Sequence, residues 1–126
     1  MTIVSNTFAF SMEIDSGKRQ LTISLRPLPQ ETQLLQNYPN PFNPETWIPF
    51  ELSQDGEVNI AIYDVQGKRI RQLELGMVMA GRHLNSGQAA YWDGKTEEGE
   101  AVASGSYFYQ LRAGDYLETK KMVILK

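Results

Sequence analysis

Proline is confined to one part of this 126-residue chain, and this restricts what can form there. All six prolines lie in residues 27–49, and residues 50–126 contain none. Because a proline disfavours helix at the residue before it, the spacing predicts an extended connector over residues 27–45. Pro27 and Pro29 are typical of a semi-extended linker. The later prolines alternate with Tyr38 and Phe42, so we expect that stretch to lie against the surface of a folded domain.

After the prolines, the pattern is one of short strands separated by turns. Apolar and polar residues alternate with a period of two in several segments, and Gly-containing pairs separate them. No stretch sustains a helical period for three turns. About seven short strands with turn signals every 8–12 residues predict an all-β fold, an antiparallel β-sandwich of the immunoglobulin or fibronectin III kind.

Three local features make sharper predictions. Pro49 has no amide to donate, so the strand over residues 47–52 should lie at a sheet edge. Asp55-Gly56 is typical of a hairpin turn, which would pair the strands on either side of it. In the strand near residue 108, alternation should place Tyr107 and Tyr109 on one face and Phe108 on the other.

The first 33 residues have a different organisation. Residues 7–26 read as a β-hairpin around a turn at residues 15–18, followed by the Pro27 and Pro29 linker. The apolar face of this hairpin consists of Phe8, Phe10, Met12, Ile14, Leu21, Ile23 and Leu25. Because an isolated hairpin is marginally stable in water, we expect this face to pack on residues 34–126 or on a second copy, which would allow self-association through residues 1–33. We therefore divide the chain into residues 1–33, the tail of an upstream region, and the sandwich of residues 34–126.

Composition argues against several classes of function. The 12 Lys and Arg residues are outnumbered by 15 Asp and Glu residues, which argues against nucleic acid as a partner. No apolar run is long enough to span a bilayer. The chain has no cysteine and one histidine, His83, too few ligands for a structural zinc site. No nucleophile has a base at a known catalytic spacing, so we expect no enzyme activity and no cofactor.

Two clusters suggest ligands, and each has a structural alternative. Carboxylates gather at Asp93, Glu97, Glu98 and Glu100. They could bind calcium, or they could belong to a solvated turn between strands. A second cluster is aromatic and consists of Tyr63, Tyr91, Trp92, Tyr107, Phe108 and Tyr109. These rings could line a sugar-binding surface, although aromatic residues on sandwich strands more often belong to the core.

Six motifs occur in an order that matches a known family. They are LQNYPNPFNP at residues 35–44, IYDVQG at 62–67, AGRH at 80–83, WDGK at 92–95, ASGSYFY at 103–109 and TKKMVILK at 119–126. In these motifs, residues 34–126 resemble the type-A C-terminal sorting domains of the type IX secretion system. The same stretch resembles a fold relative, the immunoglobulin-like domain of the flagellar hook-capping protein.

The resemblance implies a seven-stranded sandwich without catalytic activity that directs export and surface attachment of a larger secreted bacterial protein. The implied partners are the secretion translocon and a covalently fused upstream cargo, and the implied location is the cell surface or medium, reached via the periplasm. The implied sorting-motif residues are Tyr38, Pro39, Asn40, Pro41, Phe42, Asn43, Pro44, Gly105, Tyr107, Phe108, Lys120 and Lys126. The alternative is an extracellular immunoglobulin-like module that binds a carbohydrate or protein, or that assembles with other copies.

Overall fold

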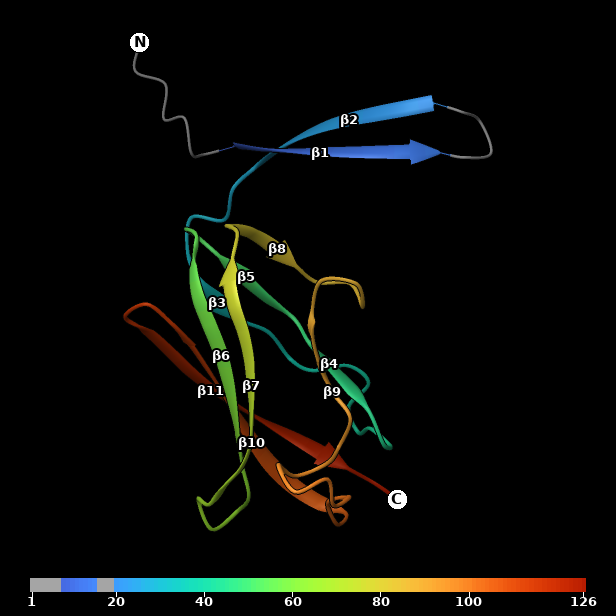
Figure 1. Ribbon diagram of the computed structural model, residues 1–126, viewed down its shortest axis with the longest axis vertical. Coiled ribbons are helices and arrows are strands. Elements are labelled where there is room, and N and C mark those ends of the chain that lie inside the picture. Colours follow the sequence, from blue (N-terminus) through green and yellow to red (C-terminus); the bar gives the residue numbers. More distant parts are fainter. Residues whose placement is uncertain (1–7, 16–19) are drawn as a thin grey trace.

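The computed structural model describes residues 8–15 and 20–126, and strands account for its regular structure (Figure 1). The strands are β1 (Phe8–Asp15), β2 (Gln20–Pro27), β3 (Gln33–Leu34), β4 (Thr46–Ile48), β5 (Phe50–Leu52), β6 (Gly56–Tyr63), β7 (Arg69–Val78), β8 (Gly81–His83), β9 (Ala90–Trp92), β10 (Gly105–Ala113) and β11 (Tyr116–Ile124). Helix is absent from this described part of the chain, so no helix there is long and apolar enough to cross a membrane. The predicted all-β fold class is confirmed.

Strands β1 and β2 form the predicted N-terminal hairpin. They pair in an antiparallel register, from Phe8 opposite Pro27 to Asp15 opposite Gln20. Their two-stranded sheet shares no ladder with the described strands of the sandwich. The predicted packing of the apolar face lies outside the described residues, so it stays a prediction, as does the domain boundary at residue 33.

The sandwich has a long layer and a divided layer. The long layer is a four-stranded antiparallel sheet in the order β11-β10-β6-β7. The opposite layer consists of the three-stranded sheet β3-β5-β8 and the pair β4-β9. Figure 1 shows the two layers face to face, with the C-terminus beside the far end of β10 and β11.

Alternating side chains from both layers fill the core. In β6, Val58, Ile60 and Ile62 are buried, as the period-two pattern predicts. In β10, Tyr107 and Tyr109 are buried on one face and Phe108 is half-buried on the other, so that prediction is also confirmed. The β6–β7 hairpin turns at Gly67, whose φ of 84° favours glycine.

Pro49 does not mark an edge strand, which corrects the sequence-based expectation. It separates β4 from β5, and β5 is the central strand of its sheet, between β3 and β8. The Pro49 carbonyl accepts a hydrogen bond from the Leu35 amide (3.0 Å). Because proline has no backbone N–H to donate, it suits the point where the chain leaves one ladder and enters another.

The expected hairpin at Asp55-Gly56 is also wrong. β5 and β6 belong to different layers, and β6 pairs with β7 and β10. The Asp55 carboxylate instead accepts a hydrogen bond from the Ala80 amide (2.7 Å). The Asp-Gly pair therefore lies where the chain crosses between layers, and Gly56 begins β6 without the positive φ that a hairpin turn of this kind requires.

Candidate functional site

The Pro-rich segment, defined here as residues 38–44, is bonded to the C-terminal strand β11. The Phe42 amide donates to the Val123 carbonyl and the Leu125 amide donates to the Phe42 carbonyl, both at 3.0 Å. The Asn40 side-chain oxygen accepts from the Val123 amide at 3.0 Å. Asn40 therefore bonds to a strand 83 positions away, and not to its own turn as such residues often do. Together these bonds cover the outer edge of β11 near its end, where an open ladder would otherwise invite strand addition.

Phe42 fixes this segment in the core. Its ring is 2% exposed and lies 5.7 Å from the ring of Trp92, which is itself fully buried. Trp92 then contacts Tyr107 edge to face at 6.2 Å. Phe42, Trp92 and Tyr107 are thus core residues from three separate sequence motifs, joined by a tilted and an edge-to-face ring contact, and such contacts stabilise beyond the area buried.

The start of the segment is held by a buried polar network. The Asn37 side-chain amide donates to the Thr46 hydroxyl (3.0 Å) and to the Pro39 carbonyl (3.2 Å). Asn37 and Thr46 are both buried, and the Thr46 hydroxyl also donates to the Pro39 carbonyl (3.1 Å). Buried polar groups are tolerated when they are paired, so this network sets the path of the chain into Pro39.

Tyr109 extends the network into the long layer. Its hydroxyl accepts from the Asn37 amide (2.9 Å) and donates to the Leu35 carbonyl (2.8 Å). The side chain is fully buried, and burial raises the pKa of Tyr109 to about 12. Tyr109 is therefore a neutral structural residue that ties the connector to β10.

A second tie joins β3 to β11. The Glu118 carboxylate accepts hydrogen bonds from the Leu34 amide (3.1 Å) and from the Tyr116 hydroxyl. Burial raises the pKa of Tyr116 to about 12, and its bond to Glu118 acts in the same direction. Burial alone would raise the pKa of Glu118, but these bonds and the Lys120 charge lower it below its usual value.

The other side chains of the Pro-rich segment face solvent. Tyr38 is 37% exposed, and Pro39, Asn40, Pro41, Asn43 and Pro44 are also exposed. The C-terminal residues Leu125 and Lys126 are exposed next to them, and the Lys126 amide donates to the Ser104 hydroxyl (2.9 Å). Because Phe42 is bonded to β11, the exposed parts of the first and last sorting motifs form one continuous surface.

The remaining predicted sorting-motif residues lie on β10 and β11. Gly105 begins β10, opposite Ile124. Lys120 lies on β11, opposite Tyr109, with its ammonium 3.7 Å from the Glu118 carboxylate. Tyr107 is in the core, so the structure brings only part of the predicted set to the surface described above.

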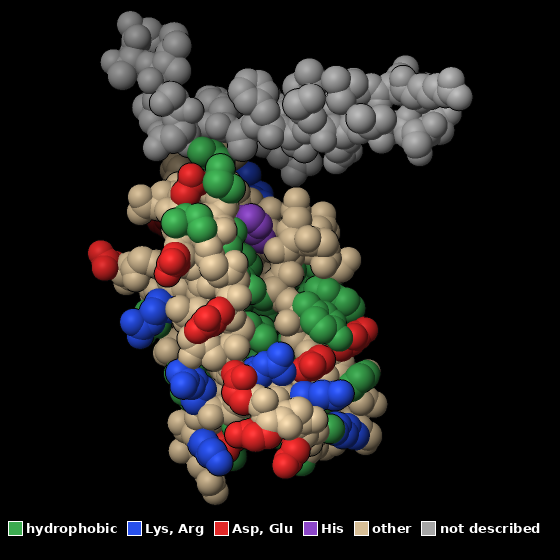
Figure 2. Space-filling view, in the orientation of Figure 1, with side chains coloured by type: hydrophobic (Ala, Val, Ile, Leu, Met, Phe, Trp, Pro, Cys, Tyr) green, Lys and Arg blue, Asp and Glu red, His purple; other side chains and the backbone are tan. Residues whose placement is uncertain are grey.

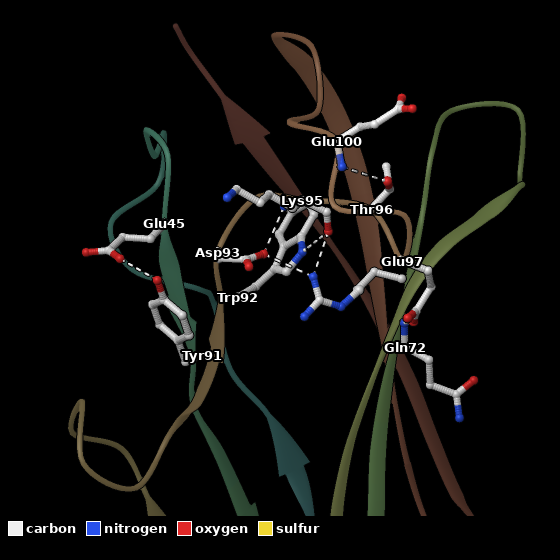
Figure 3. Close-up of polar contacts among 10 residues, drawn as sticks. Glu45, Gln72, Tyr91, Trp92, Asp93, Lys95, Thr96, Glu97 and Glu100 are labelled. Carbon is white, nitrogen blue, oxygen red and sulfur yellow. Dashed lines mark hydrogen bonds and ion pairs between the residues drawn. The ribbon is translucent and has the colours of Figure 1, made fainter.

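The carboxylate cluster lies in the turn that follows Trp92, where two of its members accept hydrogen bonds from backbone amides (Figure 3). Asp93 accepts from the Lys95 amide and from the Arg71 guanidinium, both at 3.0 Å. Glu97 accepts from the Gln72 amide at 2.7 Å, while Glu98 and Glu100 are exposed. No group of three or more His, Cys, Asp or Glu residues within the described ranges could hold a metal ion. The geometry favours the solvated turn over the calcium alternative.

The predicted aromatic surface does not form from the six residues named above. Trp92, Tyr107 and Tyr109 are buried in the core, while Tyr91 is 47% exposed. The structure instead brings Tyr91 next to Trp47, with ring centroids 5.6 Å apart, and Trp47 next to Tyr38, at 6.3 Å. The alternating burial within β4 and β9 directs Trp47 and Tyr91 outward; the alternation in the sequence could have indicated this, but no sequence signal shows that these strands pair.

His83 takes a structural position on β8. Its ring stacks on Phe50 at 4.9 Å, and its Nε2 lies 2.9 Å from the Met79 carbonyl oxygen. The single purple side chain in Figure 2 marks its place on this face, where acidic and basic side chains intermix over the lower half. Such mixed charge differs from the basic stripe of a nucleic-acid interface.

The sequence profile of the FlgD Ig-like domain matches residues 45–115, more than half of the chain. The chain belongs to the FlgD Ig-like domain family. This FlgD Ig-like domain therefore has the immunoglobulin-like sandwich that its strand pattern predicts, and the match begins directly after the Pro-rich segment. No curated protein matches its sequence.

Two solved structures share its fold. One is dimeric latent PorU from Porphyromonas gingivalis, with a TM-score of 0.56 and 16% identity over 85% of this chain. The other is PorZ from the same organism, described as an essential surface component of the type-IX secretion system, with a TM-score of 0.51 and 18% identity over 72% of this chain. The chain covers 11% of the length of each of those two proteins. At these identities the likeness concerns the fold.

Proposed function

We propose that this FlgD Ig-like domain is a non-catalytic C-terminal sorting domain, which directs a larger bacterial protein through type IX secretion to the cell surface. The observation that carries the proposal is the joining of the Pro-rich segment to the C-terminal strand. Phe42 and Asn40 bond to Val123 and Leu125, so the most distinctive sorting motif and the closing motif are exposed side by side. In this proposal, a component of the translocon binds both motifs at the same time.

The comparisons support the proposal indirectly. PorU and PorZ share the fold of the chain, and PorZ is a component of the secretion system whose sorting domains the six motifs resemble. The family match covers β4 to β10 of the sandwich. Four of the six motifs that carry the sorting resemblance lie within the match, and the Pro-rich motif and the closing motif lie outside it. The partners in this proposal are the translocon and a fused upstream cargo, and the route passes via the periplasm.

The test is to fuse residues 1–126, and separately residues 34–126, to the C-terminus of a periplasmic reporter in a bacterium with type IX machinery. Both reporters should reach the cell exterior. Removal of residues 119–126 should abolish export, since it removes most of β11. Retention of both intact fusions in the periplasm would contradict the proposal.

A second candidate is an assembly module, the alternative that accompanies the resemblance to the immunoglobulin-like domain of the flagellar hook-capping protein. Sedimentation velocity of residues 1–126 and of residues 34–126, which measures self-association, separates an assembly module from a sorting domain. Concentration-dependent association of the longer chain alone would assign self-association to residues 1–33, and association of both would favour an assembly surface on the sandwich.

A further inference from the structure

Three aromatic rings at the surface form a row, and the proposed sorting function involves only Tyr38 among them, as part of the Pro-rich segment. The row consists of Tyr38, Trp47 and Tyr91. Trp47 is opposite Tyr91 in the β4–β9 ladder and opposite Tyr38 in an isolated antiparallel bridge. Trp47 is therefore the middle ring, with one tyrosine on each side. Figure 2 shows hydrophobic side chains on the side of the molecule where Figure 1 places β4 and β9.

The row lies outside the hydrophobic core. Tyr38 is 37% exposed and Tyr91 is 47% exposed, while Trp47 is half-buried. The next residue after Tyr91, Trp92, is fully buried and supplies the core from the other face of β9. Single exposed apolar residues need no explanation, but adjoining aromatic rings on one surface often mark a binding site.

The rings are fixed before any ligand arrives. The Tyr38 hydroxyl donates to the Leu84 carbonyl at 2.5 Å, and the Tyr91 hydroxyl donates to the Glu45 carboxylate at 2.6 Å. Figure 3 shows Tyr91 directed at Glu45. The bond to Glu45 raises the pKa of Tyr91, and a phenol is protonated at neutral pH even at its ordinary pKa. A preorganised surface loses little conformational entropy when it binds.

The polar atoms at the rim determine which ligand fits. Both tyrosine protons are already donated, so the hydroxyl oxygens, the Glu45 carboxylate and the Leu84 carbonyl remain as acceptors. A Pro-rich peptide offers carbonyl acceptors and few donors, so it does not complement this rim. Quaternary ammonium ligands are bound in cages of rings that surround one point, whereas Trp47 has one tyrosine on each side, on neighbouring strands. Sugar hydroxyls donate hydrogen bonds, and the positive C–H edges of a pyranose suit a negative aromatic face.

From this geometry we infer that Tyr38, Trp47 and Tyr91 form a binding surface for a neutral polysaccharide chain, with successive pyranose units against successive rings. The uncharged exposed side chains of Asn85, Ser86 and Gln88 follow Leu84, which bonds to Tyr38, and they extend the polar rim. This inference goes beyond the proposed sorting role. It gives the surface-attached protein a contact with glycan.

The test is affinity electrophoresis of residues 1–126 in native gels that contain mixed-linkage β-glucan, xylan or galactomannan. The intact chain should be retarded by at least one of the three. Trp47→Ala and Tyr91→Ala should weaken binding about tenfold or more, because each removes a stacking face. Tyr91→Phe keeps the ring and should keep most of the binding.

Leu117→Ala is the matched control, because Leu117 is 51% exposed on β11 and lies outside the row; its retardation should equal that of the intact chain. Circular dichroism melting of every variant separates lost binding from lost folding. When the chain is titrated with a polysaccharide that binds it, the fluorescence emission of half-buried Trp47 should shift. Trp47→Ala should remove this shift, because the remaining tryptophan, Trp92, is buried and does not contact the ligand. Absence of retardation in all three gels, undiminished binding by folded Trp47→Ala, or binding of a decaproline or oligolysine peptide instead would overturn the inference.

Discussion

At the residue scale, Gly94 shows how close the Pro-rich segment lies to the turn after Trp92. Its φ is +77°, and a Cβ there would lie 2.2 Å from the Pro44 carbonyl oxygen. That neighbour is backbone, so it cannot rotate away. The Gly94 carbonyl also accepts from the Val102 amide (3.0 Å). Glycine is therefore required here by both space and conformation.

Gly94→Ala should lower the free energy of unfolding by about 3 kcal/mol or more, because a backbone clash adds to the left-handed conformation. Gly99→Ala is the control, since Gly99 has a φ of +84° but no atom within 4 Å of the added Cβ. It should cost about 1–2 kcal/mol, the conformational part alone. Urea unfolding of both variants measures the difference, and equal losses would show that Pro44 can move away.

Tyr109 gives a pH-dependent prediction. Its pKa is about 12 in the folded chain against about 10 when unfolded. The folded state thus holds the proton more tightly, and this contribution is complete below pH 10 and lost as the pH rises from 10 to 12. Linkage puts its size at about 2–3 kcal/mol.

Tyr109→Phe should reduce the loss of stability between pH 10 and 12, with the raised pKa of Tyr116 accounting for part of what remains. At pH 7 the same variant should be less stable by about 1–3 kcal/mol, because it leaves the Asn37 amide and Leu35 carbonyl without their partner. Urea titrations at pH 7 to 12 measure both effects. An identical alkaline loss in the two chains would contradict the assignment to Tyr109.

At the element scale, the contact between the Pro-rich segment and β11 depends on a few named groups. Phe42→Ala should cost about 3–5 kcal/mol, because it empties a buried site beside Trp92. Asn40→Ala should cost about 1 kcal/mol by removing the bond to the Val123 amide. Asn43→Ala, at an exposed position in the same segment, should change stability by less than about 0.5 kcal/mol. Thermal melts would contradict this order if Asn43→Ala cost as much as Asn40→Ala.

The strands of the long layer could be predicted from sequence because period-two alternation and Gly turns act locally. The alternation over residues 58–62 predicts that Val58, Ile60 and Ile62 face the core, where they are buried. In the same way, alternation predicts that Tyr107 and Phe108 lie on opposite faces. The divided layer could not be predicted as well. Pro49 suits an edge strand as well as a change of sheet, and Asp55-Gly56 occurs in hairpins as well as in crossings between layers. Which of these forms depends on the partner strand, which local sequence does not identify. The bond from Asn40 to Val123 and the row of Tyr38, Trp47 and Tyr91 depend on pairings between distant strands, which a single sequence does not reveal.

At the scale of the whole molecule, the fold brings two distant ends of the sandwich together. The Pro-rich segment precedes the residues that match the family, and the end of β11 follows them, yet the two are hydrogen-bonded neighbours. Export should depend on the exposed side chains at this junction as well as on the fold that holds them.

The most direct test uses side chains that the fold does not need. Leu125 is 58% exposed and Lys126 is exposed, and both bond through their backbone amides, so the double variant Leu125→Ser and Lys126→Ser should keep its melting temperature. Leu117→Ser, at a position 51% exposed, is the matched control. The measurement is the fraction of reporter, fused to residues 1–126, that reaches the cell exterior in a host with type IX machinery. We predict that the intact fusion and Leu117→Ser are exported while the double variant stays in the periplasm, and equal export of all three, or of none, would contradict the account.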